Sequence, residues 1–217
     1  MQTRARRERR KEARPGELLS AALDLFVEKG YAATRVEEVA QRAGVSKGTL
    51  FLYFPSKEEL FKAVVRENLS GRFAEWSQEF ESYQGSTEDL VRYCMNSWWD
   101  RVGSTKASGI PKLMMGEAGN FPELAKFYQE EVIQPGNDLI KRILQRGVAL
   151  GEFRQLDETY GVYTILAPML FLAMWKHSPG SCGDPGIALD PRKYIDSKLK
   201  TILRGLCIQG NSAREGL

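Results

Sequence analysis

Residues 34–60 of the chain read TRVEEVAQRAGVSKGTLFLYFPSKEEL. Thr34 and Glu37 have the spacing of a capping box, in which a hydroxyl and a carboxylate satisfy free backbone donors at a helix start. Apolar residues then recur at three- and four-residue intervals as far as Gly44, where glycine permits the positive φ that ends a helix. The stretch therefore begins with a short amphipathic helix.

The residues Gly44, Val45 and Ser46 form a predicted turn. Val45 can fill the space between two helices, and the Ser46 hydroxyl can cap a third helix from Lys47 to about Tyr53. Two short helices joined by such a turn make the helix-turn-helix pattern, whose second helix can lie in the DNA major groove.

Helical periodicity continues on both sides of this stretch. A helix predicted to start near Pro15 or Gly16 precedes it and stops at Gly30. Ser56 and Glu59 form a second capping box, before a helix that keeps one apolar face for about 25 residues, or roughly 38 Å. Further helices are predicted at residues 87–103, 111–116, 121–146 with a kink or break at Pro135, 157–176 and 191–208, and a flexible loop at 178–190. No segment alternates as a strand does, so the chain is predicted to be all-α.

The run at 34–60, with the helix before it, closely resembles the N-terminal DNA-binding signature of the TetR family of bacterial transcriptional regulators. The resemblance covers about residues 16–62. It implies a homodimer with a three-helix DNA-binding domain and a helical body that binds a ligand and switches DNA affinity. The expected boundaries are a basic arm at 1–14, a helix-turn-helix domain at 15–60, and an effector-binding and dimerisation domain at 61–210.

Residue chemistry and the resemblance together indicate the DNA contacts. Lys47 and Thr49 can offer a cation and a hydroxyl to bases or phosphates, and Gly48 lets the backbone approach closely. The resemblance implies DNA contacts at Ser46, Lys47, Thr49, Phe51 and Tyr53, phosphate contacts at Thr34 and Lys57, and a groove-reading role for Arg35. Phe51 departs from the tyrosine of many relatives, so Tyr53 is expected to make the polar contact. Core packing is the alternative for both aromatic residues, and a plain surface position is the alternative for Lys57.

Positive charge is concentrated at the N-terminus. The net charge of +3 arises within residues 1–60, because the remainder holds 19 basic and 19 acidic residues. Seven of the first 14 residues are Arg or Lys, and two are Glu. Clustered like charge attracts a polyanion, so this arm is expected to lie near DNA phosphates or in a minor groove. A solvated tail is the alternative.

Large, soft and aromatic side chains are frequent in the rest of the chain and can enclose an apolar cavity. The family resemblance supports assigning them to a small hydrophobic effector, with simple core packing as the alternative. The candidates are Trp98, Trp99, Met114, Met115, Phe121, Phe127, Tyr128, Met169, Met174 and Trp175.

The last two predicted helices have the character of an interface. Residues 163–175 are apolar nearly all round, which suits a helix buried between its own core and a partner subunit, and residues 194–206 carry one apolar stripe. In the resembled family, the last two helices of each subunit form a four-helix dimer seam. We expect the same here, with internal packing as the alternative. In such a dimer, the two DNA-binding domains, here called the heads, are related by a two-fold axis. They should therefore bind a roughly palindromic operator.

Other classes of protein have less support. The single histidine, His177, precedes Cys182 by five residues, which suggests neither a catalytic triad nor a metal set. We therefore predict no enzyme, metal or cofactor. A constitutive architectural DNA binder and a thiol-sensing regulator stay open. Sensing needs an exposed thiol with a low pKa, whereas Cys94 and Cys207 have the pattern of buried helix residues.

The cellular setting follows from composition. Three scattered cysteines give no disulfide framework, which fits a reducing cytoplasm. The longest apolar stretch, residues 162–175, is shorter than the ~20 residues that cross a bilayer, and no apolar segment of a secretory signal follows the basic N-terminus. We therefore expect a cytoplasmic dimeric repressor that a small hydrophobic effector releases from DNA.

Overall fold

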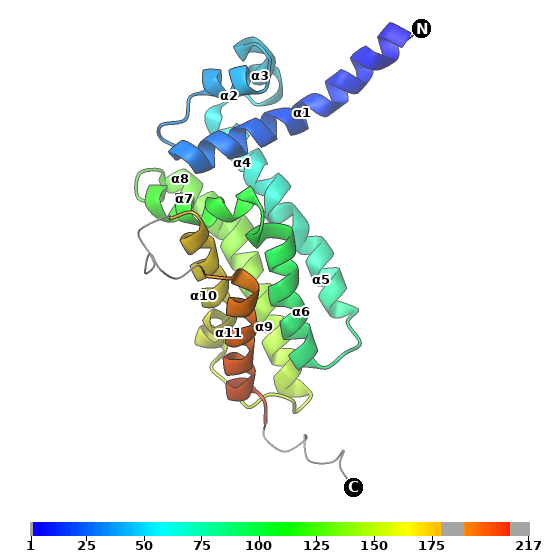
Figure 1. Cartoon of the computed structure of the whole chain (residues 1–217), viewed down its shortest axis with the longest axis vertical. Helices are drawn as coiled ribbons and strands as arrows, with labels where there is room; N and C mark the ends of the chain where they lie inside the picture. The colour runs from blue at the N-terminus through cyan, green and yellow to red at the C-terminus, as the bar shows by residue number, and fades with distance from the viewer. Residues whose placement is uncertain (1, 179–188, 209–217) are drawn as a thin grey trace. The chain divides into compact units, whose positions relative to one another are not determined.

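A computed structural model of the chain describes residues 2–178 and 189–208 (Figure 1). Side chains are described from Pro15 onward, except that of Glu158. Within these ranges the structure is helical and has no strands, apart from one isolated antiparallel bridge between Phe153 and Cys207. The all-α prediction is therefore confirmed.

The described α-helices range in length from 7 residues to 28 residues. They are α1 Gln2–Lys29, α2 Val36–Arg42, α3 Lys47–Tyr53, α4 Lys57–Asn68, α5 Phe73–Glu81, α6 Thr87–Trp98, α7 Gly109–Glu117, α8 Pro122–Tyr128, α9 Gln134–Ala149, α10 Glu158–Lys176 and α11 Pro191–Leu206. Short 3-10 turns lie at Ser70–Arg72 and Lys106–Ser108, and π-helical turns lie at Trp99–Gly103 and Gln129–Ile133.

The chain divides into two compact units. Unit 1 combines residues 1–72 with 109–132, and unit 2 combines residues 73–108 with 133–217. Unit 1 thus contains α7 and α8 in addition to the four N-terminal helices. This grouping by contacts does not test independent folding, so the three domain boundaries expected from the sequence stay a prediction.

Aromatic packing holds unit 1 together. The Phe61 ring of α4 lies edge-on to the Phe26 ring of α1 and to Tyr31, at centroid distances of 5.2 and 5.4 Å. Leu18 and Leu60 are fully buried between the same two helices. Because these large side chains pack together in one core, α1 and α4 form a rigid support for α2 and α3.

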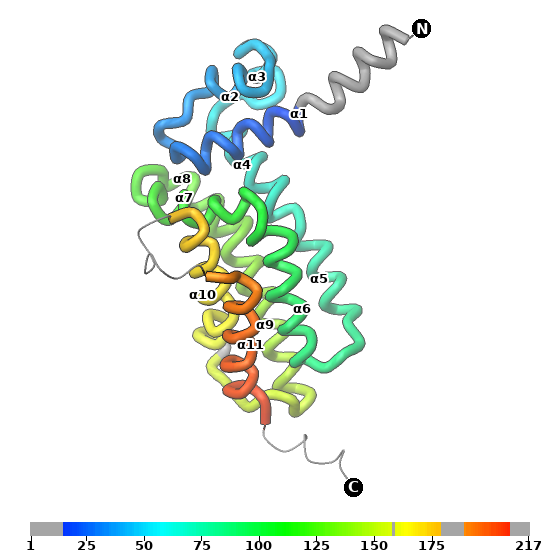
Figure 2. The backbone as a smooth tube through the Cα atoms, in the orientation of Figure 1, coloured from blue at the N-terminus to red at the C-terminus, as the bar shows by residue number. Residues whose placement is uncertain are grey.

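Unit 2 is a bundle of helices (Figure 2). The helix α9 packs against α6 and α10, and α11 packs against α6 and α10. The Asp157 carboxylate caps α10 by accepting the N–H groups of Thr159 and Tyr160 at 2.8 and 2.9 Å. Asp190 caps α11 in the same way, directly before Pro191.

Two predicted helix starts are wrong. The helix α1 begins at Gln2 rather than near Pro15, and Pro15 lies inside it. The expected capping box of Thr34 and Glu37 is displaced by one residue, since Arg35 is the N-cap of α2 and its N–H donates to Glu38 Oε2 at 3.3 Å. Proline and threonine favour helix starts, but neither residue type determines the position of the start by itself.

The long helix predicted after Ser56 is also wrong, because it is broken at residues 69–72. Leu69 leaves the helical conformation, and a 3-10 turn follows before α5. A Cβ atom at Gly71 would lie 2.6 Å from the Arg66 carbonyl oxygen, so the tight turn needs glycine there. The apolar periodicity continues through the break, which is why the sequence did not reveal it.

The remaining helix predictions have different outcomes. The Ser56 hydroxyl caps α4 by accepting the Glu59 N–H at 3.1 Å. The segment predicted to kink or break at Pro135 is not broken there: the π-helical turn Gln129–Ile133 joins α8 to α9 without a gap, and Pro135 lies in the first turn of α9. Most of the loop predicted at 178–190, including Cys182, lies outside the described residues. No helix in the described ranges is both long and apolar enough to cross a membrane.

Candidate nucleic-acid interface and effector residues

The turn between α2 and α3 fixes how α3 is held. Gly44 adopts a φ of +66°, and the Val45 N–H donates to the Ala40 carbonyl at 2.9 Å, which closes the end of α2. The Ser46 hydroxyl accepts the Thr49 N–H at 3.1 Å and caps α3. Short backbone bonds on both sides of the turn therefore set the direction of α3.

One face of α3 points away from the core of unit 1. Leu50 is fully buried, and this single contact fixes the rotation of the helix about its axis. The predicted DNA contacts on this element are exposed at Ser46, Lys47, Gly48 and Phe51 and half-buried at Thr49 and Tyr53. The turn and α3 thus bring six of the nine predicted contacts onto one element.

Leu52 belongs to the same outward face and was not predicted. It is 85% exposed, against 38% for Phe51. Since Leu50 is buried, a residue two positions further along the helix must lie on the opposite side, and the sequence could have revealed this. An exposed leucine on such a face can contact a thymine methyl group.

Lys47 is held in position by weak surface contacts. Its ammonium group lies 2.5 Å from a Glu37 carboxylate oxygen and 5.6 Å from the centroid of the Phe51 ring. The hydrogen bond from Lys47 lowers the pKa of the Glu37 carboxyl below its ordinary value. Because exposed ion pairs contribute little to stability, a DNA phosphate could replace Glu37 as the partner of Lys47.

Thr34 and Lys57, expected at phosphates, have partners within unit 1. Thr34 is 1% exposed, and its hydroxyl lies 3.1 and 2.7 Å from the carbonyl oxygens of Leu25 and Gly30. The Lys57 ammonium donates to the carbonyls of Tyr31, Ala32 and Thr34 at 2.9, 3.2 and 3.1 Å. These contacts favour a structural role, and phosphate binding by either residue stays a prediction. Arg35, in contrast, is exposed at the start of α2.

Helix α7 is attached to the loop that precedes α2. Glu117 Oε1 accepts the Ala32 N–H at 3.0 Å, and a Cβ atom at Gly30 would lie 2.9 Å from the same oxygen. The Tyr31 ring packs edge-on against Phe121, with centroids 4.7 Å apart. Burial is the larger influence on Lys57 and lowers its pKa, while the nearby Glu117 charge acts in the opposite direction. Any shift of α7 would therefore act on this loop.

A second attachment joins α4 to the residues after α8. The Arg66 guanidinium makes two hydrogen bonds to the Glu131 carboxylate, at 2.8 and 2.5 Å. It also lies over the Phe127 ring, 5.0 Å from its centroid. The hydrogen bond from Arg66 lowers the pKa of Glu131 below its ordinary value. Residues 109–132 thus contact both the loop before α2 and the end of α4.

The ten predicted effector residues fall into two groups, one in each unit. In unit 1, Met114, Phe127 and Tyr128 are buried, Phe121 is half-buried and Met115 is exposed; in unit 2, Met169 is buried, and Trp98, Trp99, Met174 and Trp175 are half-buried. In unit 2 the two tryptophan rings lie against Gly103, where any larger side chain would collide with them. The effector role of both groups stays a prediction.

The thiols that the structure describes are poorly suited to redox sensing. Burial raises the pKa of the Cys94 thiol to about 12. Cys207 was expected to be buried in a helix, but it is half-buried and caps the end of α11. Burial and the neighbouring Glu88 carboxylate raise its pKa. Both shifts reduce the thiolate fraction on which reactivity depends.

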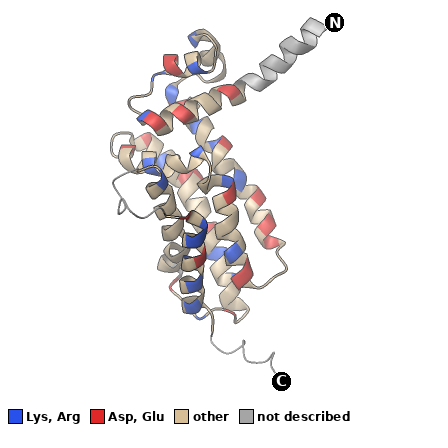
Figure 3. Cartoon of the chain, viewed as in Figure 1, with Lys and Arg blue, Asp and Glu red and all other residues tan. Residues whose placement is uncertain are grey.

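The outward faces of α10 and α11 differ in charge (Figure 3). Among the α10 side chains that the structure describes, which exclude that of Glu158, the exposed ones are uncharged: Thr159, Tyr160, Tyr163, Thr164, Ala167, Leu170 and Phe171. The helix α11 buries its predicted stripe and exposes several basic residues. An uncharged, partly aromatic face on a surface helix is typical of a helix that pairs with another subunit.

The capped turn, the buried Leu50 and the outward face of α3 define a helix-turn-helix DNA-binding protein. Comparisons with known proteins agree. Residues 18–64 match the family model described as bacterial regulatory proteins of the tetR family, and residues 90–178 match that of the AefR-like transcriptional repressor C-terminal domain. The chain belongs to the tetR family of bacterial regulatory proteins.

Individual relatives differ in how much of the chain they match. The transcriptional repressor KstR2 of Mycolicibacterium smegmatis is 28% identical over 77% of this chain and 81% of its own length. The regulator RutR of Escherichia coli K12 is 48% identical, but over only 32% of each chain. The structure of the fatty acid degradation regulator FadR from Bacillus halodurans covers 88% of this chain and 94% of its own, with a TM-score of 0.71 and 22% identity. That structural likeness concerns the fold alone.

Proposed function

We propose that this protein is a dimeric transcriptional repressor that binds a roughly palindromic DNA operator and is released by a small hydrophobic effector. The observation that carries the proposal is the outward face of α3, which the turn and the buried Leu50 hold in place. The name of the relative KstR2, a transcriptional repressor, supports the sense of regulation. In this proposal, residues 15–60 read DNA, the arm at 1–14 adds affinity, and residues 61–210 bind the effector and dimerise.

Each named contact has a chemical role in this proposal. Lys47 exchanges Glu37 for a phosphate, while Phe51 and Leu52 offer apolar contacts to base edges. Tyr53 provides the hydroxyl that Phe51 lacks. Arg35 reaches a groove from the start of α2, and Ser46 and Thr49 approach the backbone of the DNA. Thr34 and Lys57 act by shaping the loop before α2.

Dimerisation in this proposal uses α10 and α11. The uncharged exposed face of α10 supports an isologous four-helix seam, in which each subunit contributes the same two helices. Two heads across such a seam would meet half-sites about one helical turn of DNA apart. The partners are therefore operator DNA, a second copy of the chain and a hydrophobic effector.

Release is proposed to be a population shift between two arrangements of the heads. Residues 109–132 hold the loop before α2 through Glu117 and the end of α4 through Glu131. An effector bound among the apolar candidate residues would favour a position of these helices in which the heads no longer match the operator spacing. Effector-independent binding and thiol sensing are the alternatives.

Selection of bound duplexes from random DNA tests the proposal. The purified protein should enrich a palindrome that it binds as a dimer, with a steep salt dependence. Apolar compounds should then shift its thermal unfolding and release the selected duplex. Weak binding without sequence preference in the absence of any effector would contradict the repressor sense. Operator binding that no apolar compound alters would favour an effector-independent architectural protein.

The arm has a test of its own. Deleting residues 2–13 should weaken operator binding and flatten its salt dependence by about 0.9 log unit per lost phosphate contact, while sequence preference is kept. Replacing Lys106 with alanine provides the control, because this exposed lysine lies in unit 2, outside α10 and α11. A salt slope unchanged by the deletion would refute a role for the arm at the phosphates.

A further inference from the structure

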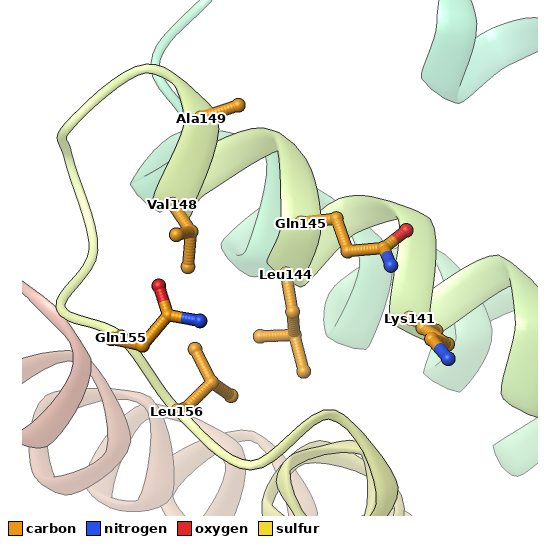
Figure 4. Close-up of a pocket in the computed structure, with 7 residues that line it drawn as sticks. All are labelled: Lys141, Leu144, Gln145, Val148, Ala149, Gln155 and Leu156. Carbon is orange, nitrogen blue, oxygen red and sulfur yellow. The ribbon is translucent and has the colours of Figure 1, made fainter.

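A cavity of about 290 Å³ lies within unit 2 (Figure 4). One wall is the second half of α9, and the other is the stretch between α9 and α10. None of the ten candidates lines it. The volume is near the lower end of the range of about 300 to 1,000 Å³ that is usual for small-molecule sites.

The α9 wall is a single face of that helix. Lys141, Leu144, Gln145 and Val148 recur at three- and four-residue intervals, so their side chains lie one above another along α9. In Figure 4 the side chains of Leu144, Val148 and Leu156 converge on one space. The centre of the cavity is therefore aliphatic.

The opposite wall is fixed by glycines and by backbone bonds. Gly151 adopts a φ of +68° at the end of α9, and the buried Phe153 ring packs directly on Gly147. The Arg154 N–H then donates to the Leu206 carbonyl of α11 at 2.8 Å. These contacts hold the start of the connecting stretch, so the cavity has a preformed wall rather than a loose loop.

The floor of the cavity depends on a third glycine. Leu156 lies so close to Gly161 of α10 that a Cβ atom there would collide with its side chain, and Leu144 lies near the same point. Gly161 therefore allows Leu156 to sit close against α10, with its side chain turned toward α9. A ligand in the cavity would contact both α9 and the segment that leads into α10.

The polar side chains that line the cavity are those of Lys141, Gln145 and Gln155. Lys141 supplies a cation, and Gln145 and Gln155 supply amide donors. Among the described residues that line the cavity, none carries a carboxylate. An aliphatic centre accompanied by amide donors and a cation matches a molecule that has an apolar body and a carboxylate head.

We propose that this cavity is a second small-molecule site, which takes a small amphiphilic carboxylate with its apolar body against Leu144, Val148 and Leu156 and its head near Lys141. At roughly 30 Å³ per heavy atom, the value for liquid water, the cavity admits about ten non-hydrogen atoms. A straight-chain eight-carbon carboxylate has this size. The site differs in place and in lining from the predicted effector residues.

Calorimetric titration of the full chain with octanoate and with octan-1-ol tests the site. Octanoate should bind about tenfold more tightly than the alcohol, because only the carboxylate can accept charge-assisted hydrogen bonds from Lys141. The variant Lys141→Met should lose this preference but still bind the alcohol. Lys106→Met, which removes an exposed lysine from the turn before α7, should keep the preference.

A blocking variant locates the binding. Gln155 is exposed and points into the cavity in Figure 4, so Gln155→Trp should fill the space without disturbing the core and should abolish binding. Gln84→Trp is the matched control, because Gln84 is exposed in another connecting stretch of unit 2. Circular dichroism checks that both variants fold. If Gln155→Trp fails to fold, the comparison of Lys141→Met with the wild type still tests the proposal.

Three results would overturn the proposal. Octanoate could fail to bind at millimolar concentration, it could bind equally well to Gln155→Trp, or octanoate and the alcohol could bind the wild type alike. These titrations contain no DNA, so their failure would leave the proposed operator binding untouched. Conversely, failure to select an operator would not affect the evidence for carboxylate binding in this cavity.

Discussion

On α3, Leu50 and Leu52 have opposite surroundings although two positions separate them. Leu50 is fully buried and anchors the helix, whereas Leu52 is 85% exposed. Their side chains have the same transfer free energy, so the difference arises from the rotation of the helix alone. An exposed leucine between Phe51 and Tyr53 has no role in the core of unit 1, which leaves contact with DNA as its expected role.

Replacing Leu52 with alanine should therefore weaken operator binding and leave the fold intact. We expect a loss of about 1 to 2 kcal/mol, or roughly five- to thirtyfold in affinity, from the apolar contact that is removed. Fluorescence anisotropy with the selected duplex measures it. Leu150→Ala, at an exposed leucine in unit 2, should bind as the wild type does. Equal affinity of the Leu52 variant and the wild type would exclude Leu52 from the interface.

Thr34 and Lys57 show the limit of residue chemistry. A hydroxyl and an ammonium group suit a phosphate, yet here they have carbonyl partners inside unit 1. The same donors can bind either kind of acceptor, and the sequence does not say which acceptor lies within reach. The position of the loop before α2, which contains Tyr31, determines which acceptor these donors reach. That position depends on packing between distant segments.

Among the helices, α7 has a position that its sequence does not suggest. It follows unit 2 residues in the chain, but its last residue, Glu117, contacts the loop before α2, and Phe121 at the start of α8 packs on the same loop. These contacts restrain the loop from which α2 begins. The readiness of the head to bind DNA should accordingly depend on α7.

Substitutions at Glu117 test this dependence. Glu117→Ala removes the acceptor of the Ala32 N–H and should weaken operator binding about two- to tenfold, the value of one ordinary hydrogen bond. Glu117→Gln keeps an acceptor oxygen and should restore most of the affinity. Operator titrations of both variants measure the difference. If the alanine and glutamine variants bind equally well, the hydrogen bond does not position the loop.

The pair of Arg66 and Glu131 predicts a dependence on pH. The pKa of Glu131 is lower in the folded protein than its ordinary value of 4.5, because Arg66 stabilises the carboxylate. The stabilisation is thus present above pH 4.5 and is lost as the pH falls through the lowered pKa. Since both side chains are partly exposed, solvent screening limits it to about 1 kcal/mol.

Urea unfolding of Glu131→Gln and the wild type should show this difference near pH 7 and lose it progressively as the pH falls below 4.5 through the lowered pKa of Glu131. The exposed Glu123 of α8 provides the control, since Glu123→Gln should follow the wild type throughout. A deficit of Glu131→Gln that persists unchanged in acid would mean that the ion pair is not its cause.

For the whole molecule, the uncharged face of α10 is the feature with the largest expected consequence. It exposes Tyr163 and Phe171, although such side chains are usually covered. A two-fold seam would cover both at once. Dimerisation would also set the spacing of the two heads, which no single subunit can determine.

The variant Tyr163→Arg should break the seam, because it places two unpaired charges in an apolar contact. We expect the dissociation constant of the dimer to rise a hundredfold or more, with a matching loss of operator affinity. Light scattering after size-exclusion chromatography measures the mass. Ala74→Arg, on the exposed side of α5, should remain dimeric. A Tyr163→Arg protein that is still dimeric at micromolar concentration would move the interface elsewhere.

Local signals were sufficient for much of the fold. The caps at Ser46 and Ser56 were predicted from single side chains and their immediate neighbours. Such features depend on bonds within a few residues, so short stretches of sequence determine them. The break at 69–72 was missed, because an apolar periodicity continues through it and Gly71 alone gives an ambiguous signal.

The sequence by itself determined the all-α class, the helix-turn-helix and the outward character of α3, because caps, turns and periodicity act over short distances. The tertiary structure alone decided that Thr34 and Lys57 turn inward, that residues 109–132 group with the N-terminal helices, and that α9 and Leu156 enclose a cavity. Each of these depends on contacts between segments far apart in the chain. Their free energies come from packing that no local pattern encodes.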